Sequence, residues 1–362
     1  MRTTSFANGS IGPAHERTIG AHAAHRVLQS GAKGFDPVPE GAGASEFIYQ
    51  KKATGDSDEH AESLGKWDQT YDQMTPGPFV GQVVEMWFRG IQVFRETTNR
   101  SVCQNGAPWK NCHIIGIPLA MSGPALFSRQ QVSLDNVFTF QSEQGFSLTT
   151  PDEFDVIGIA ISDTTLAQLA ADDDPRGICQ LIQDTPSVLL PCKDKLAELR
   201  NCLTSVLDPR NFQPELLRYP QVQRNMHSAI VGHVMETLRS AQPAPMPTPS
   251  FKARSHLVNE AINLVMAHAS EPPTVEELCI KLNISRRMLN YSFQETLGTT
   301  PLHYLRSLRL NGVRRDLRAA SIRNPAISDI AGRWGFWHLP RFAAEYRSLF
   351  GELPSTTLKN RH

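Results

Sequence analysis

A helical segment near the C-terminus presents side chains of the types that read DNA bases. In residues 286–297, apolar residues recur at helical spacing and must share one face, which comprises Leu289, Phe293 and Leu297. The opposite face carries Arg287, Asn290, Tyr291 and Gln294. An arginine can pair with O6 and N7 of guanine, and an asparagine or glutamine with N6 and N7 of adenine. The sequence therefore predicts a base-reading face on this helix.

The residues before this helix predict another short helix and a tight turn. Thr274 and Glu277 form a capping-box pattern, in which each side chain accepts a hydrogen bond from the other residue's amide. The helix that starts there soon breaks, and Ser285 is placed to cap the next helix, which Gly298 is placed to end. Two short helices joined by such a turn are typical of a helix-turn-helix unit, here residues 274–297.

The same design recurs in residues 325–350. Asn324 can cap a helix that has Pro325 at its first position, and Gly335 with Phe336 predicts the turn that follows. The next predicted helix exposes Pro340, Arg341, Ala344 and Arg347. We therefore expect a second helix-turn-helix unit.

A predicted helix over residues 302–318 joins the two units. At ~1.5 Å per residue it spans ~25 Å, so reading helices at its two ends could reach adjacent major grooves, which repeat every ~34 Å. Its outward arc is predicted to hold Ser307, Asn311, Arg314, Arg315 and Arg318. We assign to DNA phosphates Arg286, Arg314, Arg315, Arg318 and Arg347. Arg306 and Arg309 fall among apolar residues and need either a buried carboxylate or an outward path.

Charge is divided unevenly along the chain. The 362 residues carry 36 Lys+Arg and 36 Asp+Glu, so the net charge is zero. Residues 250–362 hold 16 Lys+Arg against 9 Asp+Glu, a net charge of +7, which leaves −7 on residues 1–249. A basic C-terminal part suits contact with a polyanion such as DNA.

The composition and periodicity of successive segments predict a multidomain α+β protein. Residues 1–65 are rich in Gly, Ala, Ser and His and are expected to be disordered, whereas 66–165 alternate short β-branched runs with turn residues, as in a β-rich, barrel-like domain. Residues 166–240 show helical periodicity, and their apolar stripe either forms a dimer seam or covers the chain's own β domain. The proline-rich segment 241–250 predicts a linker to an all-α domain over 251–362.

Several classes of protein do not fit the sequence. No apolar run approaches the ~20 residues that span a bilayer, and the first residues lack a secretion signal, so we expect a cytoplasmic protein without membrane contact. The six cysteines include no CxxC pair, which favours reduced thiols over a zinc finger. No HxH cluster, GxSxG elbow or GxxxxGK[ST] loop is present, so we expect no enzyme; a metal-dependent barrel enzyme is the least favoured alternative.

The C-terminal part resembles the two-unit DNA-binding domain of the AraC/XylS family of bacterial regulators. The resemblance covers about Ser255 to Leu358 and rests on VEELCIKLNISRRMLNYSFQETLGTTP, YLRSLRLNGVRRDL and ISDIAGRWGFWHLPRFAAEYRSLFGELPS. It implies base-reading positions at Arg287, Asn290, Tyr291, Pro340, Arg341 and Ala344. The family's usual Ser or Asp cap is replaced by His338, and the second reading helix has few donors. Contacts with DNA shape or thymine methyl groups are therefore expected to replace some direct hydrogen bonds there.

A second resemblance reaches the β-rich part. YDQMTPGPFVGQVVEMWFRGIQVFRE and LTTPDEFDVIGIAIS are similar to family members that regulate ethanolamine utilisation operons, which implies ethanolamine with adenosylcobalamin as a candidate effector. Among the aromatic residues, Phe79, Trp87, Phe94 and Trp109 either line a ligand cage or form plain core. Among the carboxylates, Glu85, Glu153 and Asp155 either balance an ammonium ligand or are simply solvated.

These inferences predict a sequence-specific DNA-binding transcriptional regulator, an activator of a catabolic operon that responds to a small molecule. The expected partners are double-stranded DNA, RNA polymerase, the effector and a second copy of the chain. A ligand-independent DNA-binding repressor or architectural protein is the alternative.

Overall fold

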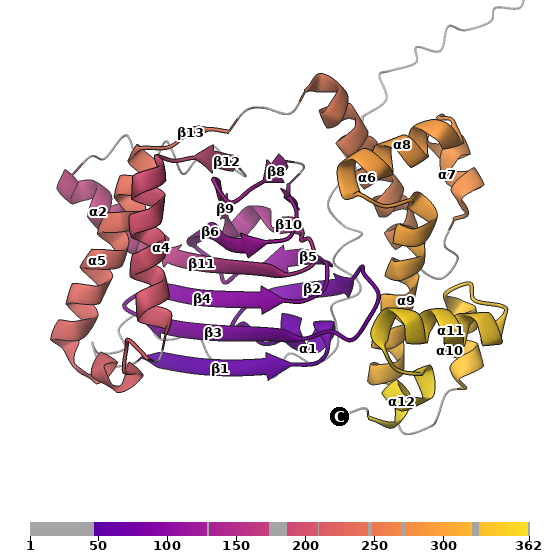
Figure 1. Ribbon diagram of the computed structural model, residues 1–362, viewed down its shortest axis with the longest axis horizontal. Helices are drawn as coiled ribbons and strands as arrows, with labels where there is room; N and C mark the ends of the chain where they lie inside the picture. Colours follow the sequence, from indigo (N-terminus) through magenta and orange to yellow (C-terminus); the bar gives the residue numbers. More distant parts are fainter. Residues whose placement is uncertain are drawn as a thin grey trace, which may run out of the picture. The chain divides into compact units, whose positions relative to one another are not determined.

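The computed structural model describes residues 47–128, 130–173, 187–208, 210–244, 248–268, 273–320 and 326–360 (Figure 1). A β-rich domain is followed by a helical domain, which confirms the predicted α+β class. The expected disorder before Phe47, the predicted Asn324 cap and its Pro325 lie outside the described residues. Among the described residues, no helix combines the length and apolar character needed to cross a membrane.

The β-rich domain consists of two antiparallel sheets that do not close into a barrel. The larger sheet has the strand order β1-β3-β4-β11-β6-β9-β12-β13, and the smaller has the order β2-β5-β10-β7-β8. The strands are β1 (Ile48–Thr54), β2 (Asp68–Gln73), β3 (Gly81–Phe88), β4 (Ile91–Thr98), β5 (Val102–Ala107), β6 (Cys112–Met121), β7 (Ala125–Phe127), β8 (Gln130–Val132), β9 (Val137–Gln141), β10 (Phe146–Thr149), β11 (Phe154–Ser162), β12 (Ser187–Leu190) and β13 (Gln242–Pro243).

Strand β11 shows why the centre of the larger sheet is apolar on both faces. It pairs with β4 on one side and β6 on the other. Because alternate residues of a strand point to opposite faces, Ile157 and Ile159 join the core under the helices, whereas Val156 and Ala160 join a separate core with residues of the smaller sheet. The near-continuous apolar run of this strand therefore reflects burial on both sides.

Helices α4 (Lys193–Leu207) and α5 (Pro220–Arg239) pack side by side on one face of the larger sheet (Figure 1). Their apolar stripes bury Leu196, Leu199, Leu203, Ile230, Val234 and Leu238. Most of the predicted stripe thus covers the chain's own β domain, one of the two alternatives left open by the sequence. A dimer seam on these helices stays a prediction.

The β-rich domain extends beyond both predicted boundaries. Strand β1 and the short helix α1 (Ser57–Ala61) lie within the segment that was expected to be disordered. Strand β1 is at the sheet edge and pairs only with β3 among the described strands, so its polar residues remain exposed and give no alternating pattern. Strands β12 and β13 complete the other edge from segments predicted to be helix and linker.

The helical domain is built around one connecting helix. It comprises α6 (Pro249–Ala267), α7 (Val275–Lys281), α8 (Arg286–Leu297), α9 (Pro301–Ala319), α10 (Ile327–Arg333), α11 (Leu339–Phe350) and α12 (Pro354–Lys359). Leu305 and Leu308 of α9 belong to a core shared with α6, α7 and α8, whereas Val313 and Leu317 belong to a core shared with α10 and α11. Helix α9 therefore carries both helix-turn-helix units, as the sequence predicts.

Candidate nucleic-acid and domain interfaces

Helix α8 presents the polar face that the sequence predicts for base reading. Ser285 caps it by accepting a hydrogen bond from the Met288 amide, and Gly298 ends it with a φ of 67°. Leu289 and Phe293 are fully buried. The opposite face leaves exposed Arg287, Asn290, Tyr291 and Gln294. The packing of this helix therefore leaves the predicted base-reading side chains accessible.

Two neighbouring arginines shape this face. The Arg286 guanidinium lies 2.9 Å from the Glu276 carboxylate in an exposed ion pair. Arg254 of α6 pairs with Glu295 and lies 5.2 Å from the centre of the Tyr291 ring, in a cation–π contact. The Tyr291 ring, 56% exposed, is thus supported from its own domain.

Helix α11 begins with an unusual cap. The His338 Nδ1 accepts a hydrogen bond from the Arg341 amide at 3.2 Å. An accepting Nδ1 places the proton of a neutral imidazole on Nε2, so the exposed ring offers one donor outward. Phe342 and Tyr346 are buried, whereas the other face exposes Pro340, Arg341, Ala344 and Arg347. The Arg341 guanidinium is partly engaged, because it donates to Glu345 at 2.9 Å.

Trp337, directly before His338, is a candidate that the sequence analysis missed. Its side chain is 87% exposed, and its ring makes an edge-on contact with His338 at 5.6 Å between centroids. A tryptophan left in solvent beside a reading helix suits an apolar contact with a partner. The available signal was a large aromatic residue placed between the buried Phe336 and the cap of the helix.

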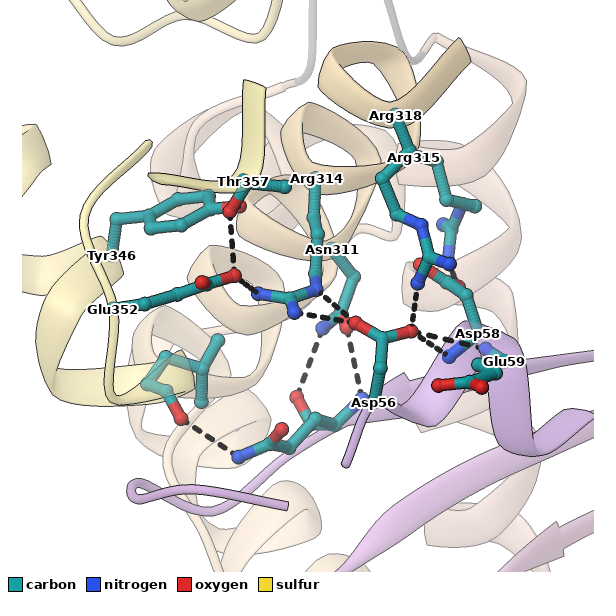
Figure 2. Close-up of polar contacts among 12 residues, drawn as sticks. Asp56, Asp58, Glu59, Asn311, Arg314, Arg315, Arg318, Tyr346, Glu352 and Thr357 are labelled. Carbon is teal, nitrogen blue, oxygen red and sulfur yellow. Dashed lines mark hydrogen bonds and ion pairs between the residues drawn. The ribbon is translucent and has the colours of Figure 1, made fainter. Parts of the chain in front are cut away.

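The connecting helix α9 contradicts the exposed arc predicted for it. Ser307, Asn311 and Arg314 are 2%, 1% and 7% exposed. Three arginines of this stripe contact carboxylates of the β domain, although Arg315 and Arg318 remain about 30% exposed (Figure 2). Arg314, Arg315 and Arg318 are therefore not available in this arrangement as the phosphate contacts that were expected. Helical spacing fixed their common face, but only tertiary packing decided what covers it.

Ion pairs and hydrogen bonds form this domain interface, which we define by Asp56, Asp58, Asp72 and Gln73 of the β domain and Asn311, Arg314, Arg315 and Arg318 of α9. Arg314 contacts Asp56 and also lies 3.0 Å from Glu352, and Arg318 contacts Asp56 (Figure 2). Arg315 lies 2.7 Å from Asp72 and 3.6 Å from Asp58. Each arginine thus has at least one carboxylate partner.

Backbone contacts fix the position of α9 more specifically than charge does. The Asn311 amide group donates to the Gln73 carbonyl at 2.9 Å, and its oxygen accepts from the Gln73 amide at 2.9 Å. The Gln73 side chain donates to the Leu349 carbonyl at 2.7 Å. A reciprocal pair of this kind tolerates little sliding, so it sets the register between β2 and α9.

Two carboxylates of the domain interface, Asp56 and Asp58, have pKa values shifted in opposite directions. Burial alone would raise the pKa of Asp56, but Arg314, the Glu59 amide and Arg318 outweigh it, so its pKa lies below the ordinary value. Burial raises the pKa of Asp58 to about 6, because the opposing charge of Arg315 compensates only in part. Asp58 Oδ2 is also buried without a hydrogen-bond partner.

The two arginines predicted to lie among apolar residues find different solutions. Arg306 lies 3.1 Å from Glu345 of α11, which supplies a carboxylate. Arg309 places its guanidinium 5.3 Å from the centre of the Phe336 ring. Both contacts tie α9 to the second helix-turn-helix unit.

A small cavity of about 30 Å³ lies between the two sheets. Its lining is mostly aromatic and aliphatic, with Glu96, Gln69, Gln104 and Tyr71 as the polar groups. Phe94 and Phe138 line it because they lie over Gly158 and Gly116, where a Cβ atom would be 2.1 Å from either ring. Of the predicted pocket aromatics only Phe94 reaches this cavity.

The predicted Glu85 is not a free ligand for an ammonium group. It is fully buried and accepts hydrogen bonds from Gln50, the Gly65 amide, Trp87 and Gln92. These donors satisfy the carboxylate within the domain.

A possible metal-ligating group lies on the helices that cover the sheet. Ligand atoms of Glu198, His233 and Glu236 lie within 4.8 Å of one another. Lys195 already contacts both carboxylates, at 3.0 and 2.8 Å. The cluster is thus explained by a surface ion-pair network.

Comparisons with known proteins concern the helical domain. Residues 278–360 match a family model described as a helix-turn-helix domain. A probable thc operon regulatory protein of Rhodococcus erythropolis is 40% identical over 103 residues, 28% of this chain and 31% of that protein. A XylDLEGF operon transcriptional activator of Pseudomonas putida is 34% identical over 140 residues, 39% of this chain and 42% of that protein. The chain therefore matches less than half the length of these curated relatives.

A solved AraC-type regulator from Chromobacterium violaceum is 31% identical over 30% of this chain and 96% of that chain, with a TM-score of 0.28. The matched residues 278–360 include both predicted reading helices and the helix that joins them. The relatives reported above are not described as ethanolamine regulators, so the resemblance to that group stays a prediction. Residues 278–360 therefore form a helix-turn-helix domain, the family whose model they match.

Proposed function

We propose that this chain is a transcriptional regulator that binds double-stranded DNA through α8 and α11 in two adjacent major grooves. The observation that carries the proposal is that both helices expose their predicted faces while a single helix, α9, packs against both units. A common rigid support fixes the spacing of the two reading faces, which binding to successive grooves requires.

The proposed base readers are Arg287, Asn290, Tyr291 and Gln294 on α8 and Pro340, Arg341 and Ala344 on α11. Helix α11 offers few free donors, because Arg341 is shared with Glu345. We add Trp337 and the His338 Nε2 to this face, as an apolar contact and a donor. The second half-site is therefore expected to depend on thymine methyl groups and DNA shape more than the first.

The proposed phosphate contacts are Arg286 and Arg347, which are exposed at the two reading helices. Arg314, Arg315 and Arg318 instead serve to attach α9 to the β domain. Phosphate contacts would position the helical domain on the DNA duplex. The domain interface instead positions the helical domain on the β domain.

The β domain is proposed to bind a small effector in the cavity between its sheets and to act on an operon as an activator. The name of the Pseudomonas putida relative, an operon transcriptional activator, supports this role. RNA polymerase and a second copy of the chain are the further proposed partners, in the cytoplasm. Ethanolamine with adenosylcobalamin is one candidate effector.

The test of DNA binding is a footprint of the full chain on its own upstream DNA, followed by binding titrations. Arg287→Ala should cost roughly 1–3 kcal/mol on the specific site and relax preference at one or two base pairs. Arg224→Ala, an exposed arginine on α5, is the matched control and should change neither. Equal losses for Arg287→Ala on specific and random DNA would contradict its role as a base reader.

A ligand-independent DNA-binding protein is the second candidate, and the size of the cavity favours it. A site needs roughly 10–15 Å³ to hold one water, so about 30 Å³ holds only about two. If no small molecule changes either thermal stability or DNA affinity, this candidate replaces the effector-responsive regulator.

A further inference from the structure

We infer that Glu96 and His60 connect the cavity between the sheets to the domain interface, so that a ligand contacting Glu96 alters how the β domain holds α9. The inference rests on the proposed function, because it gives the proposed effector site a route to the reading helices. Its physical basis is a continuous series of contacts from the cavity wall to the arginines of α9.

The first contact lies at the cavity. Glu96 of β4 lines the cavity and is 3% exposed. Its carboxylate accepts a hydrogen bond from the Tyr71 hydroxyl and lies 3.5 Å from the Gln104 amide group. It is a buried carboxylate beside apolar space, so a ligand that brings a donor or a positive charge would gain a strong partner there.

The second contact joins Glu96 to helix α1. The Nε2 atom of the buried His60 lies 3.0 Å from Glu96 Oε1, yet the nitrogen makes no hydrogen bond of acceptable geometry. The other ring nitrogen of His60 is 2.8 Å from the Thr54 hydroxyl. The pair is therefore close but imperfectly aligned, and the same carboxylate is open to competition from a ligand in the cavity.

The third contact transmits a displacement of His60 to α9. Helix α1 has only five residues, and Asp56 caps it by accepting from the Asp58 and Glu59 amides at 2.9 and 3.0 Å. A shift of so short a helix moves its cap, and Asp56 contacts both Arg314 and Arg318 (Figure 2). His60, Asp56 and Arg314 are all buried, so a displacement at one end of this route has little free space in which to dissipate.

Strand β2 supplies a parallel route. Tyr71 is hydrogen-bonded to Glu96, with which it lines the cavity, and the next two residues of the strand are Asp72 and Gln73. Asp72 pairs with Arg315, and Gln73 holds Asn311 through two backbone hydrogen bonds. Both routes start at one carboxylate and end on the same face of α9.

The lining of the cavity indicates the chemical class of the ligand. Aromatic rings of Trp67, Phe94, Phe140 and Phe146 surround the space that Glu96 adjoins. A carboxylate among aromatic rings favours a small organic ammonium ion, which would take the place that His60 now holds at Glu96. Since the cavity holds only about two waters, such a ligand must be small or must open the site.

Cys103 provides a native probe of the domain interface. It is a free, buried thiol of β5 whose Sγ accepts a hydrogen bond from the Tyr304 hydroxyl of α9 at 3.4 Å. Cys112 is a free, buried thiol of the same domain that lies in the core between the sheets. Alkylation of Cys103 by N-ethylmaleimide, resolved by mass spectrometry, therefore reports loss of the contact with α9, and Cys112 reports opening of the β domain itself.

The test compares Glu96→Gln with Glu62→Gln in the full chain. Glu62 is exposed at the end of α1, so it is a matched control for the same replacement. Glu96→Gln should accelerate alkylation of Cys103 by about tenfold while that of Cys112 changes less than about twofold, and Glu62→Gln should change neither. Unchanged alkylation of Cys103 in a folded Glu96→Gln variant would overturn the coupling.

A ligand titration of the wild-type protein tests the same coupling if Glu96→Gln fails to fold. Wild-type protein is titrated with propylamine, propanol and propionate, which share a size but differ in charge. Propylamine alone should accelerate alkylation of Cys103 and raise the melting temperature. A melting-temperature rise without any change at Cys103 overturns the coupling, and a response to propionate or to none of the three overturns the ligand class.

DNA titrations in the same samples separate this inference from the proposed function. If wild-type protein binds no DNA, the proposed function fails whatever Cys103 shows. If the wild type binds DNA and Glu96→Gln alters both the alkylation rate of Cys103 and the affinity for DNA, the proposed function and the coupling are both supported. If DNA binding is normal but Cys103 does not respond, only the coupling fails.

Discussion

Replacing Arg315 by glutamine tests the energetic role of the domain interface. Arg315 lies 2.7 Å from Asp72 and 3.6 Å from Asp58, whose side chains are only 5% and 15% exposed. Removing one partner of a buried ion pair costs about 3–5 kcal/mol, because the remaining charge stays buried. The Arg315 side chain is 31% exposed, and solvent screening reduces the loss below that range, so we expect about 2–3 kcal/mol at pH 7.

The pH dependence of this loss has a defined sign. Without Arg315, the pKa of Asp58 rises further above its value in the unfolded chain, and the folded state takes up protons as the pH falls. Protonation relieves the unpaired charge. The difference between variant and wild type should therefore shrink between pH 7 and pH 5, by up to about 1.4 kcal/mol per unit for one carboxylate.

Urea unfolding at pH 7 and pH 5, with alkylation of Cys103 as the readout of the domain interface, measures both quantities. Arg210→Gln is the matched control, because Arg210 is 87% exposed and pairs only with Asp208 among the described residues. We expect this control to change stability little at either pH. The reasoning would be refuted if Arg315→Gln lowered the free energy of unfolding no more than Arg210→Gln does, or by the same amount at both pH values.

Three further changes test separate parts of the structure. The pKa of Asp58 is raised from 3.8 to about 6, so the free energy of unfolding of the wild type should fall as the pH rises from about 4 to 6. Asp58→Asn should make the free energy of unfolding less dependent on pH in urea titrations across that range. Trp337→Ala should weaken binding to the specific site by roughly 1–3 kcal/mol. If the indole contacts thymine methyl groups, this loss of affinity should disappear on a duplex that has uracil in place of thymine. Retained DNA affinity with lost transcription would instead assign Trp337 to a protein partner. Gly116→Ala should displace the Phe138 ring, lower the melting temperature and abolish any ligand-induced stabilisation, because the new Cβ would lie 2.1 Å from that ring; unchanged melting would show that the ring moves freely.

Local signals explain why the helical domain was predictable. Thr274 with Glu277, Ser285 and Gly298 mark the helix ends by backbone hydrogen bonding within a few residues, and the structure forms each of these caps. The apolar spacing of α8 then fixes which side chains remain outside, so the exposure of Arg287 and Asn290 followed from the sequence. Their contacts with DNA stay predictions.

The β domain was harder to delimit because its edges carry little pattern. Strand β1 lies at the sheet edge with polar residues exposed, so nothing in its composition distinguishes it from a disordered segment. Glu96 and His60 were missed for a related reason. They lie 36 positions apart and meet only because α1 packs against the β domain.

The sequence alone determined the two helix-turn-helix units, the side chains that α8 and α11 leave exposed and the apolar stripe of the helices over the sheet, since caps and helical periodicity act over a few residues. Only the tertiary structure decided that Arg314, Arg315 and Arg318 meet Asp56, Asp58 and Asp72. An arginine on a helix face carries the same charge whether a phosphate or a carboxylate neutralises it. Which of the two it meets depends on packing between segments more than 240 residues apart, and no local pattern records that distance.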